Sequence, residues 1–216
     1  MRLPSWAADH RRLRPVLLGL GVLIVVALVG GGAWWWHRSQ ESRGLAALAD
    51  ATLLVQQAEA APPTSPARDA AIKALEGVIA QYPRLSAVGQ AAYQLGNLQY
   101  AAARYGPARG AFELAVAKDS AGSLQGLAGL GIGYTWEAEK KYDNAIKAYE
   151  QVSKGKSPKT FLYEEALMAQ ARAQAEAGKG QAAVEIYQRL LRESPESPQA
   201  SDLRGRIASL QGRSSQ

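Results

Sequence analysis

The 216-residue sequence contains no cysteine, only two histidines and only two phenylalanines. The absence of cysteine excludes disulfides, a thiol nucleophile, a cysteine-ligated metal and a lipidated N-terminal cysteine. With few β-branched runs and little Phe, a large β-sheet is disfavoured, whereas the many Ala and Leu residues favour helix. The composition therefore predicts an all-α protein.

Residues that could carry catalysis are equally scarce. His10 and His37 lie on either side of a long apolar run, so they cannot join in one metal or Ser-His-Asp site. The carboxylate pairs Glu137/Glu139 and Glu164/Glu165 are expected on solvated helix turns rather than converging in a pocket. We therefore expect no enzyme activity, catalytic residue, metal, cofactor or small-molecule substrate.

The positive charge does not indicate a nucleic-acid partner. The net charge is +6, but residues 1–14 hold four arginines and one aspartate, and the rest of the chain is close to balanced. No Lys/Arg stripe is visible in the remainder. Binding of nucleic acid therefore has no electrostatic support.

Residues 15–36 form an uncharged run that is long enough to cross a lipid bilayer. Arginines crowd its N-terminal end, and Trp34, Trp35 and Trp36 suit the opposite membrane interface. This bias places the basic residues 1–14 in the cytoplasm and everything after the span outside it. The alternative is a cleaved signal peptide, for which 31–33 (Gly-Gly-Ala) offers small residues.

The rest of the chain predicts repeated helical hairpins. Residues 37–60 read as a helix that continues from the span, and the Pro-rich stretch 61–69 reads as a loop. Beyond it, four similar segments begin at Ala71, Ala108, Ala145 and Ala183, which are 37 or 38 positions apart. Four positions after each Ala stands a large side chain: Leu75, Phe112, Tyr149 or Tyr187. A second helix precedes three of these segments, at 87–105, 124–142 and 161–179.

Small residues recur in these preceding helices. Gly96 and Gly133 each stand 12 positions before the repeated Ala, where a small residue permits close helix packing. Gly126, Gly129 and Gly133 share one helical face, which favours packing over a phosphate-binding loop because no strand precedes them.

This pattern resembles the tetratricopeptide repeat, with Leu95-Gly96, Tyr105 and Ala108 in one unit and Tyr142, Ala145 and Tyr149 in the next. The resemblance implies a right-handed α-solenoid over residues 70–195, followed by a capping helix and tail over 196–216. The period is longer than that of the usual tetratricopeptide unit, so longer turns between repeats are expected. The layout as a whole also resembles the YfgM-like family of bacterial single-span proteins, whose repeat domain is periplasmic and linked to protein export.

In such folds the first helices of successive units line a concave groove. The positions carried over to this sequence are Tyr93, Asn97, Tyr100, Leu130, Tyr134, Glu137, Met168 and Arg172. Aromatic and Met side chains with a few polar groups suit peptide or helix binding, although packing against neighbouring helices is an equal alternative. The resemblance thus implies a scaffold or chaperone-like adaptor in the bacterial inner membrane, with envelope or translocon-associated proteins as partners. The alternative is a structural accessory subunit of an envelope complex.

Overall fold

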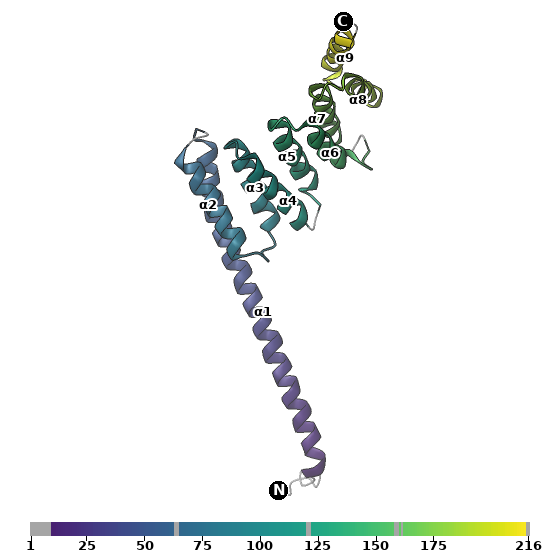
Figure 1. Ribbon diagram of the computed structural model, residues 1–216. Helices are drawn as coiled ribbons and strands as arrows, with labels where there is room; N and C mark the ends of the chain where they lie inside the picture. Colours follow the sequence, from purple (N-terminus) through teal and green to yellow (C-terminus); the bar gives the residue numbers. More distant parts are fainter. Residues whose placement is uncertain (1–9, 63–64, 120–121, 158–159, 161, 215–216) are drawn as a thin grey trace.

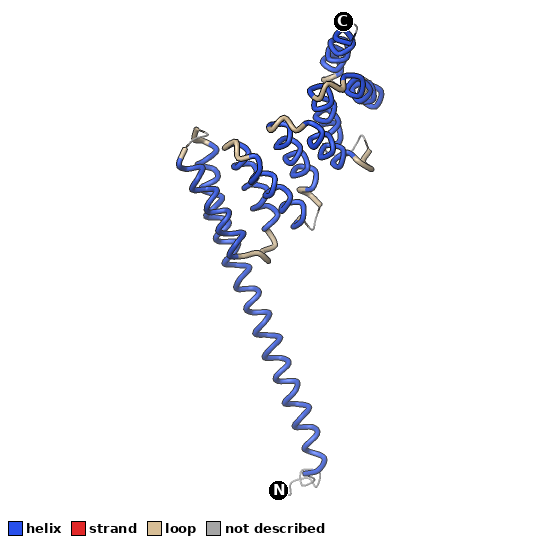
Figure 2. The backbone as a smooth tube through the Cα atoms, viewed as in Figure 1, coloured by secondary structure: helices blue, strands red, loops and turns tan. Residues whose placement is uncertain are grey.

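The computed structural model describes residues 10–62, 65–119, 122–157, 160 and 162–214, and this part of the chain contains helices and no strand (Figure 2). The helices are α1 (His10–Glu59), α2 (Pro66–Gln81), α3 (Val88–Ala101), α4 (Tyr105–Lys118), α5 (Gln125–Ala138), α6 (Tyr142–Ser153), α7 (Tyr163–Glu176), α8 (Gly180–Glu193) and α9 (Ala200–Ser214). α1 is a long rod, and the shorter helices stack beyond its C-terminal part (Figure 1). The prediction of an all-α chain with a helical-repeat solenoid is confirmed.

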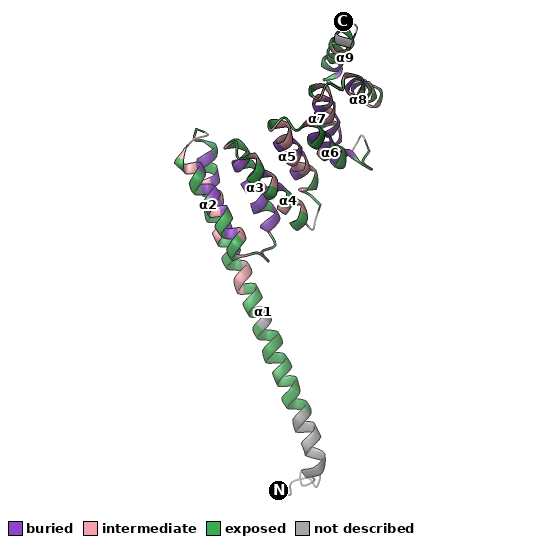
Figure 3. Ribbon diagram, viewed as in Figure 1, coloured by how far each residue is buried: buried purple, intermediate pink, exposed green. Residues whose placement is uncertain are grey.

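The solenoid consists of helical hairpins, because each helix packs mainly on its neighbours in the chain. The first hairpin pairs the C-terminal part of α1 with α2. Leu48, Ala51, Val55 and Ala58 recur every three or four residues on α1 and are buried against α2 and α3. The N-terminal part of α1 projects away from the stack and is exposed along its described length (Figure 3).

The turn within three of the hairpins has the same backbone geometry. Ala103, Lys140 and Gly178 all adopt positive φ, at 56°, 57° and 76°. In each turn the next amide N–H bonds to a carbonyl five residues earlier, at 2.8–2.9 Å, as in a Schellman C-cap. The three positions are spaced like the repeated Ala residues, so the sequence period is also a period of the backbone.

The turns between hairpins are longer, as the period predicted. Those after α4 and α6 cover residues 119–124 and 154–162, whereas the turns inside the α3–α4, α5–α6 and α7–α8 hairpins cover only 102–104, 139–141 and 177–179. Asp119 stabilises the first of the long turns, because its carboxylate accepts the amide N–H groups of Leu124 at 2.5 Å and Gln125 at 3.1 Å. These two amides lie at the N-terminus of α5, where the helix leaves them without partners.

Glycine lets the helices approach closely enough to bury aromatic rings. A Cβ on Gly96 or Gly131 would lie only 2.6–2.7 Å from the ring of Phe112, and one on Gly133 would overlap Tyr149. Gly129 faces Val152 in the same way. The prediction that these glycines serve packing is confirmed, and the alternative of a phosphate-binding loop is wrong because residues 125–138 are helical.

One predicted boundary differs from the structure. The Pro-rich stretch 61–69 was expected to be a loop throughout, but α2 already begins at Pro66. Pro66 fits the first turn because it needs no amide donor there, and Ser65 caps the helix by accepting the N–H of Ala67 at 3.2 Å. The prediction that the helix of residues 37–60 continues from the span is confirmed, because these residues form the last part of α1, which ends at Glu59. Of the N-terminal segment 1–14, residues 1–9 lie outside the described residues.

Candidate functional site

The predicted groove residues lie on the first helices of three successive hairpins. α3 carries three of them, α5 carries three and α7 carries two: Tyr93, Asn97 and Tyr100; Leu130, Tyr134 and Glu137; Met168 and Arg172. Spacings of three and four residues place the members of each set on one side of their helix. Whether they form one site therefore depends on contacts between the helices.

α5 and α7 are joined by a charged pair at this face. The Arg172 guanidinium donates to both carboxylate oxygens of Glu137, from Nε at 2.7 Å and from Nη2 at 3.0 Å. The hydroxyl of Tyr149, which is fully buried in α6, donates to the same carboxylate at 2.6 Å. This bidentate geometry fixes both side chains, because two parallel hydrogen bonds set the orientation as well as the distance.

Tyr134 completes this part of the face. Its ring meets that of Tyr149 edge-on, with 5.6 Å between centroids, and its hydroxyl donates to Glu165 of α7 at 2.8 Å. The Arg172 guanidinium lies 5.9 Å from the Tyr134 ring centroid. Hence Tyr134, Glu137 and Arg172, which were predicted as groove residues, form one polar network together with Tyr149 and Glu165.

The network determines the protonation of its members. Burial alone would raise the pKa of Glu137, but the hydrogen bonds from Arg172 and Tyr149 outweigh it and hold the pKa below its ordinary value. Burial, followed by the hydrogen bond to Glu137, raises the pKa of Tyr149 far above the ordinary value of a phenol. The network therefore contains an ionised carboxylate, a guanidinium and neutral tyrosines at neutral pH.

The α3 residues form a second part of the face. The Tyr93 ring packs 5.9 Å from Phe112, and the Tyr100 ring packs 5.6 Å from Tyr105. Tyr100 remains 38% exposed, and Asn97 is exposed as well. Burial raises the pKa of Tyr100, with further contributions from Tyr105 and from the charge of Glu137. The charge of Arg172 opposes that of Glu137 in this effect on the pKa of Tyr100.

A hollow adjoins Tyr93. It has a volume of about 560 Å³ and lies between the start of α3, the end of α4 and the turn before α5. Besides Tyr93 it is lined by polar side chains, among them Gln90, Gln94, Lys118 and Asp119. The volume is in the range of ligand-sized clefts, so the α3 part of the face offers an aromatic ring beside a polar recess.

Two predictions for individual residues need correction. Leu130 is only 4% exposed and packs in the core between α5, α6 and α7, so its side chain contributes no exposed groove surface. Glu137 was expected on a solvated turn, but it is half-buried and held by Arg172 and Tyr149. Met168 is less buried than Leu130, because it is only partly buried against the core cluster of α7, α8 and α9.

Sequence reasoning treated Tyr149 only as a packing residue and overlooked its hydroxyl. A signal was available: the two preceding equivalent positions hold Leu75 and Phe112, whereas a fully buried tyrosine must find a partner for its O–H. A nearby carboxylate would have been the expected partner of this O–H. Glu137 lies on α5, the helix that comes just before α6, which carries Tyr149. Glu165 gave no comparable signal, since its partner belongs to the preceding hairpin.

A separate charged cluster occupies α4 and α5. Arg109 stacks 3.4 Å from the Trp136 ring centroid and pairs with Glu139 at 3.2 Å, and Lys141 also reaches Glu139 at 3.0 Å. The hydrogen bond from Lys141, with the charge of Arg109, holds the pKa of Glu139 below its ordinary value. Within the described residues, no three His, Cys, Asp or Glu side chains are grouped to hold a metal ion. The cluster therefore links α4 to the end of α5 through ion pairs.

Comparison with known proteins agrees with this architecture. The family model of the tetratricopeptide repeat matches residues 137–207. This range contains the end of α5, all of α6, α7 and α8, and the start of α9. Solved structures of nearly identical TPR-like repeats, from a Podosopora anserina protein described as a putative kinesin light chain, share the fold. One superimposes with a TM-score of 0.59 at 18% identity, covering 76% of this chain and 84% of the other.

A second structure of that protein, carrying one substitution, gives the same TM-score of 0.59 at 17% identity over the same shares of both chains. No curated protein matches the sequence. The chain therefore carries tetratricopeptide-type repeats in a solenoid of helical hairpins. Solenoids of stacked repeats present an extended concave surface of the kind that serves for binding.

Proposed function

We propose that this protein is a membrane-anchored interaction scaffold or chaperone-like adaptor, which binds polypeptide on the periplasmic side of a bacterial inner membrane. The observation that carries the proposal is the face shared by α3, α5 and α7. There, partly exposed aromatic side chains flank a fixed Glu137–Arg172 pair. A location near the protein-export machinery follows from the resemblance in layout to YfgM-like proteins.

The anchor is supported by the exposure of α1. Its large apolar side chains from Leu20 to Trp36 are 52–70% exposed, and no other described element covers them. A run of 22 residues spans about 33 Å as a helix, which matches a hydrocarbon core of about 30 Å. Because arginines precede the run, we place the N-terminus in the cytoplasm and the solenoid in the periplasm.

Binding of a polypeptide is supported by the chemistry of the face. Tyr93, Tyr100 and Tyr134 provide large, rigid contact surfaces with polar tips, which are enriched at protein interfaces. The Glu137–Arg172 pair supplies fixed donors and acceptors between them. Since the pair links α5 to α7, binding there would be sensitive to the angle between successive hairpins.

The binding face is tested by site-specific photocrosslinking in native membranes. A benzoylphenylalanine placed at Asn97 or Tyr100 should capture protein partners, because both side chains are exposed on the proposed face. The same residue at Lys147 of α6 or Glu185 of α8, which are exposed elsewhere, is the matched control. Equal capture from the control positions would refute the assignment of this face.

The topology is tested with single cysteines, for which the cysteine-free chain gives no background. A membrane-impermeant maleimide should label Lys154→Cys, which lies in the exposed turn after α6, without breaking the inner membrane. Ser5→Cys should react only after lysis. The intact mass of the same samples tests signal cleavage, since loss of residues before Trp34 would remove the anchor.

A structural accessory subunit of an envelope complex is the second candidate. It is favoured by the direct continuation of α1 into the first hairpin, since a rigid connection can transmit a fixed position from the bilayer to the solenoid. The crosslinking experiment separates the two. Many unfolded clients favour the adaptor, whereas one stoichiometric partner that persists in mild detergent favours the subunit.

A further inference from the structure

The turn between α2 and α3 lies where α1 enters the solenoid, at the side from which the rod projects (Figure 1). A Cβ on Gly44 of α1 would lie 2.9 Å from Leu85 Cδ1 and 3.1 Å from Tyr82 Cγ, so this turn is pressed directly against the rod. Gly44 lies about 12 Å beyond Trp36 at a rise of 1.5 Å per residue. With Trp36 at the membrane interface, the turn therefore adjoins the headgroup layer.

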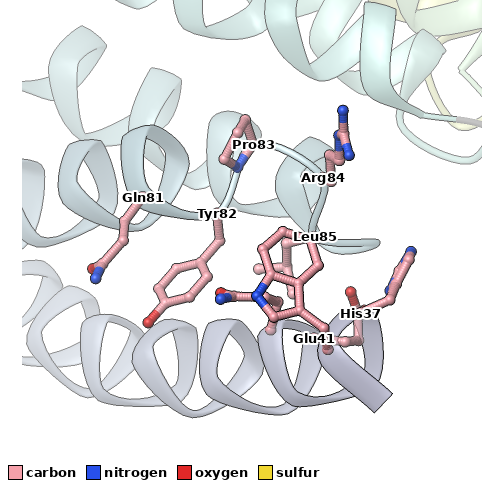
Figure 4. A pocket seen from close by; sticks show the side chains of 9 residues that line it. His37, Glu41, Gln81, Tyr82, Pro83, Arg84 and Leu85 are labelled. Atoms are coloured by element: carbon pink, nitrogen blue, oxygen red, sulfur yellow. The ribbon is translucent and has the colours of Figure 1, made fainter. Parts of the chain in front are cut away.

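A pocket of about 470 Å³ opens between this turn and α1. α1 contributes Trp36, His37, Gln40 and Glu41 to its lining, and the end of α2 with the following turn contributes Gln81 to Leu85 (Figure 4). The side chain of Tyr82 extends toward α1, whereas that of Arg84 extends away from α1, and His37 lies at the end of the pocket opposite Gln81 (Figure 4). The pocket thus combines aromatic and aliphatic surface with cationic and hydrogen-bonding groups, and its volume fits a small ligand.

Among the described residues that line the pocket, Glu41 is the single carboxylate, and it is already engaged. It accepts hydrogen bonds from the Ser86 backbone N–H at 3.2 Å and from the Ser86 hydroxyl. This holds the turn onto α1 and satisfies the acidic group with donors of the protein itself. Arg84 is exposed beside it, and the same region of α1 carries Arg38 and the exposed Arg43. The surroundings are therefore net positive.

We infer that this pocket binds the headgroup of an anionic phospholipid from the periplasmic leaflet. The inference rests on the proposed membrane anchorage and goes beyond it. Arg84 would pair with the phosphate, the imidazole N–H of His37 would be a second donor, and Trp36 would lie along the glycerol and upper acyl region. Basic groups beside apolar surface at headgroup depth are the chemistry that recognises such lipids. Occupancy would fix the solenoid's orientation relative to the bilayer.

The test uses the full chain in nanodiscs of phosphatidylcholine that contain a small fraction of photoactivatable phosphatidylglycerol. Crosslinks mapped by mass spectrometry should fall on Trp36 and on residues 82–85. Arg84→Gln should reduce this labelling about fivefold, the effect of one juxtamembrane cation, and Trp36→Leu should reduce it as well. Lys147→Gln, at an exposed site on α6, is the control and should leave it unchanged.

Three results would overturn the inference: labelling of the pocket that is insensitive to Arg84→Gln, labelling confined to residues 15–33, or equal labelling by phosphatidylcholine with the same photoreactive group. Arg84 is exposed, so the variant should fold, and its circular dichroism spectrum checks this. Alkaline carbonate extraction is run in parallel. A chain that washes off membranes refutes the anchorage itself, whereas a retained chain without Arg84-dependent labelling refutes the lipid site alone.

Discussion

Replacing Gly133 with Ala tests the close packing that holds the third hairpin together. Of all the described glycines, Gly133 would bring an added Cβ closest to another atom. That atom belongs to the ring of Tyr149. That ring cannot easily move, since it is 0% exposed and its hydroxyl donates to Glu137 at 2.6 Å. Overpacking costs about 1–3 kcal/mol, and displacing the ring also weakens a hydrogen bond worth about 1 kcal/mol.

Alanine has a compensating advantage, because it favours a helix over glycine by about 1 kcal/mol. The net expectation for Gly133→Ala is therefore a loss of about 2 kcal/mol. Gly110 is the matched control: it lies inside α4, and an added Cβ there would meet nothing within 4 Å. Gly110→Ala should stabilise the chain by about 0.5–1 kcal/mol, since only the helix preference changes.

The measurement is urea unfolding of the full chain in detergent, followed by circular dichroism. The two alanine variants should differ by about 3 kcal/mol in free energy of unfolding, with opposite signs relative to the parent. Equal stabilisation by both substitutions would refute the argument, because it would mean that α5 and α6 do not pack as closely as the structure shows.

The same unfolding assay tests four further predictions. Lys140→Gly should stabilise by about 0.5–1 kcal/mol, because φ is 57° there and Gly tolerates positive φ; a loss of stability would contradict the C-cap. Ser65→Ala should cost about 1 kcal/mol by removing the cap of α2, and an unchanged midpoint would show that the cap is not needed. Phe112→Ala should cost about 3–5 kcal/mol, because it empties the space between Gly96 and Gly131, and a cost under about 1 kcal/mol would contradict that packing. The lowered pKa of Glu137 contributes stability that is present above the unfolded pKa of about 4.3 and is lost as the pH falls through the folded value. Glu137→Gln should therefore reduce the loss of stability in acid. Identical pH profiles for the variant and the parent would contradict this.

The repeat architecture could be predicted because its signals are local. Helix formers at spacings of three and four, an Ala that recurs at a nearly constant period and Gly at a fixed distance before it all follow from the packing of one hairpin. The start of α2 was misplaced for a local reason too. Pro66 was interpreted as a helix breaker, although proline is also favoured at the first helical position when a capping Ser precedes it.

The candidate site was only partly predictable, because its chemistry depends on contacts between hairpins. Glu137 and Arg172 are 35 residues apart, so nothing in the local sequence indicates that they meet. Likewise, whether Leu130 faces a groove or a core depends on the rotation of α5 against its neighbours. The pocket between α1 and the turn before α3 had no signal in the sequence, because these two segments are distant from each other along the chain.

The sequence by itself determined the periodic helical hairpins, the apolar N-terminal run and the lack of cysteine chemistry, because composition and short-range spacing specify these directly. Only the tertiary structure decided which polar groups became partners and which apolar residues stayed exposed. The reason is physical: burial and ion pairing depend on how closely and at what angle two hairpins pack, and that arrangement is set by side chains from both of them at once.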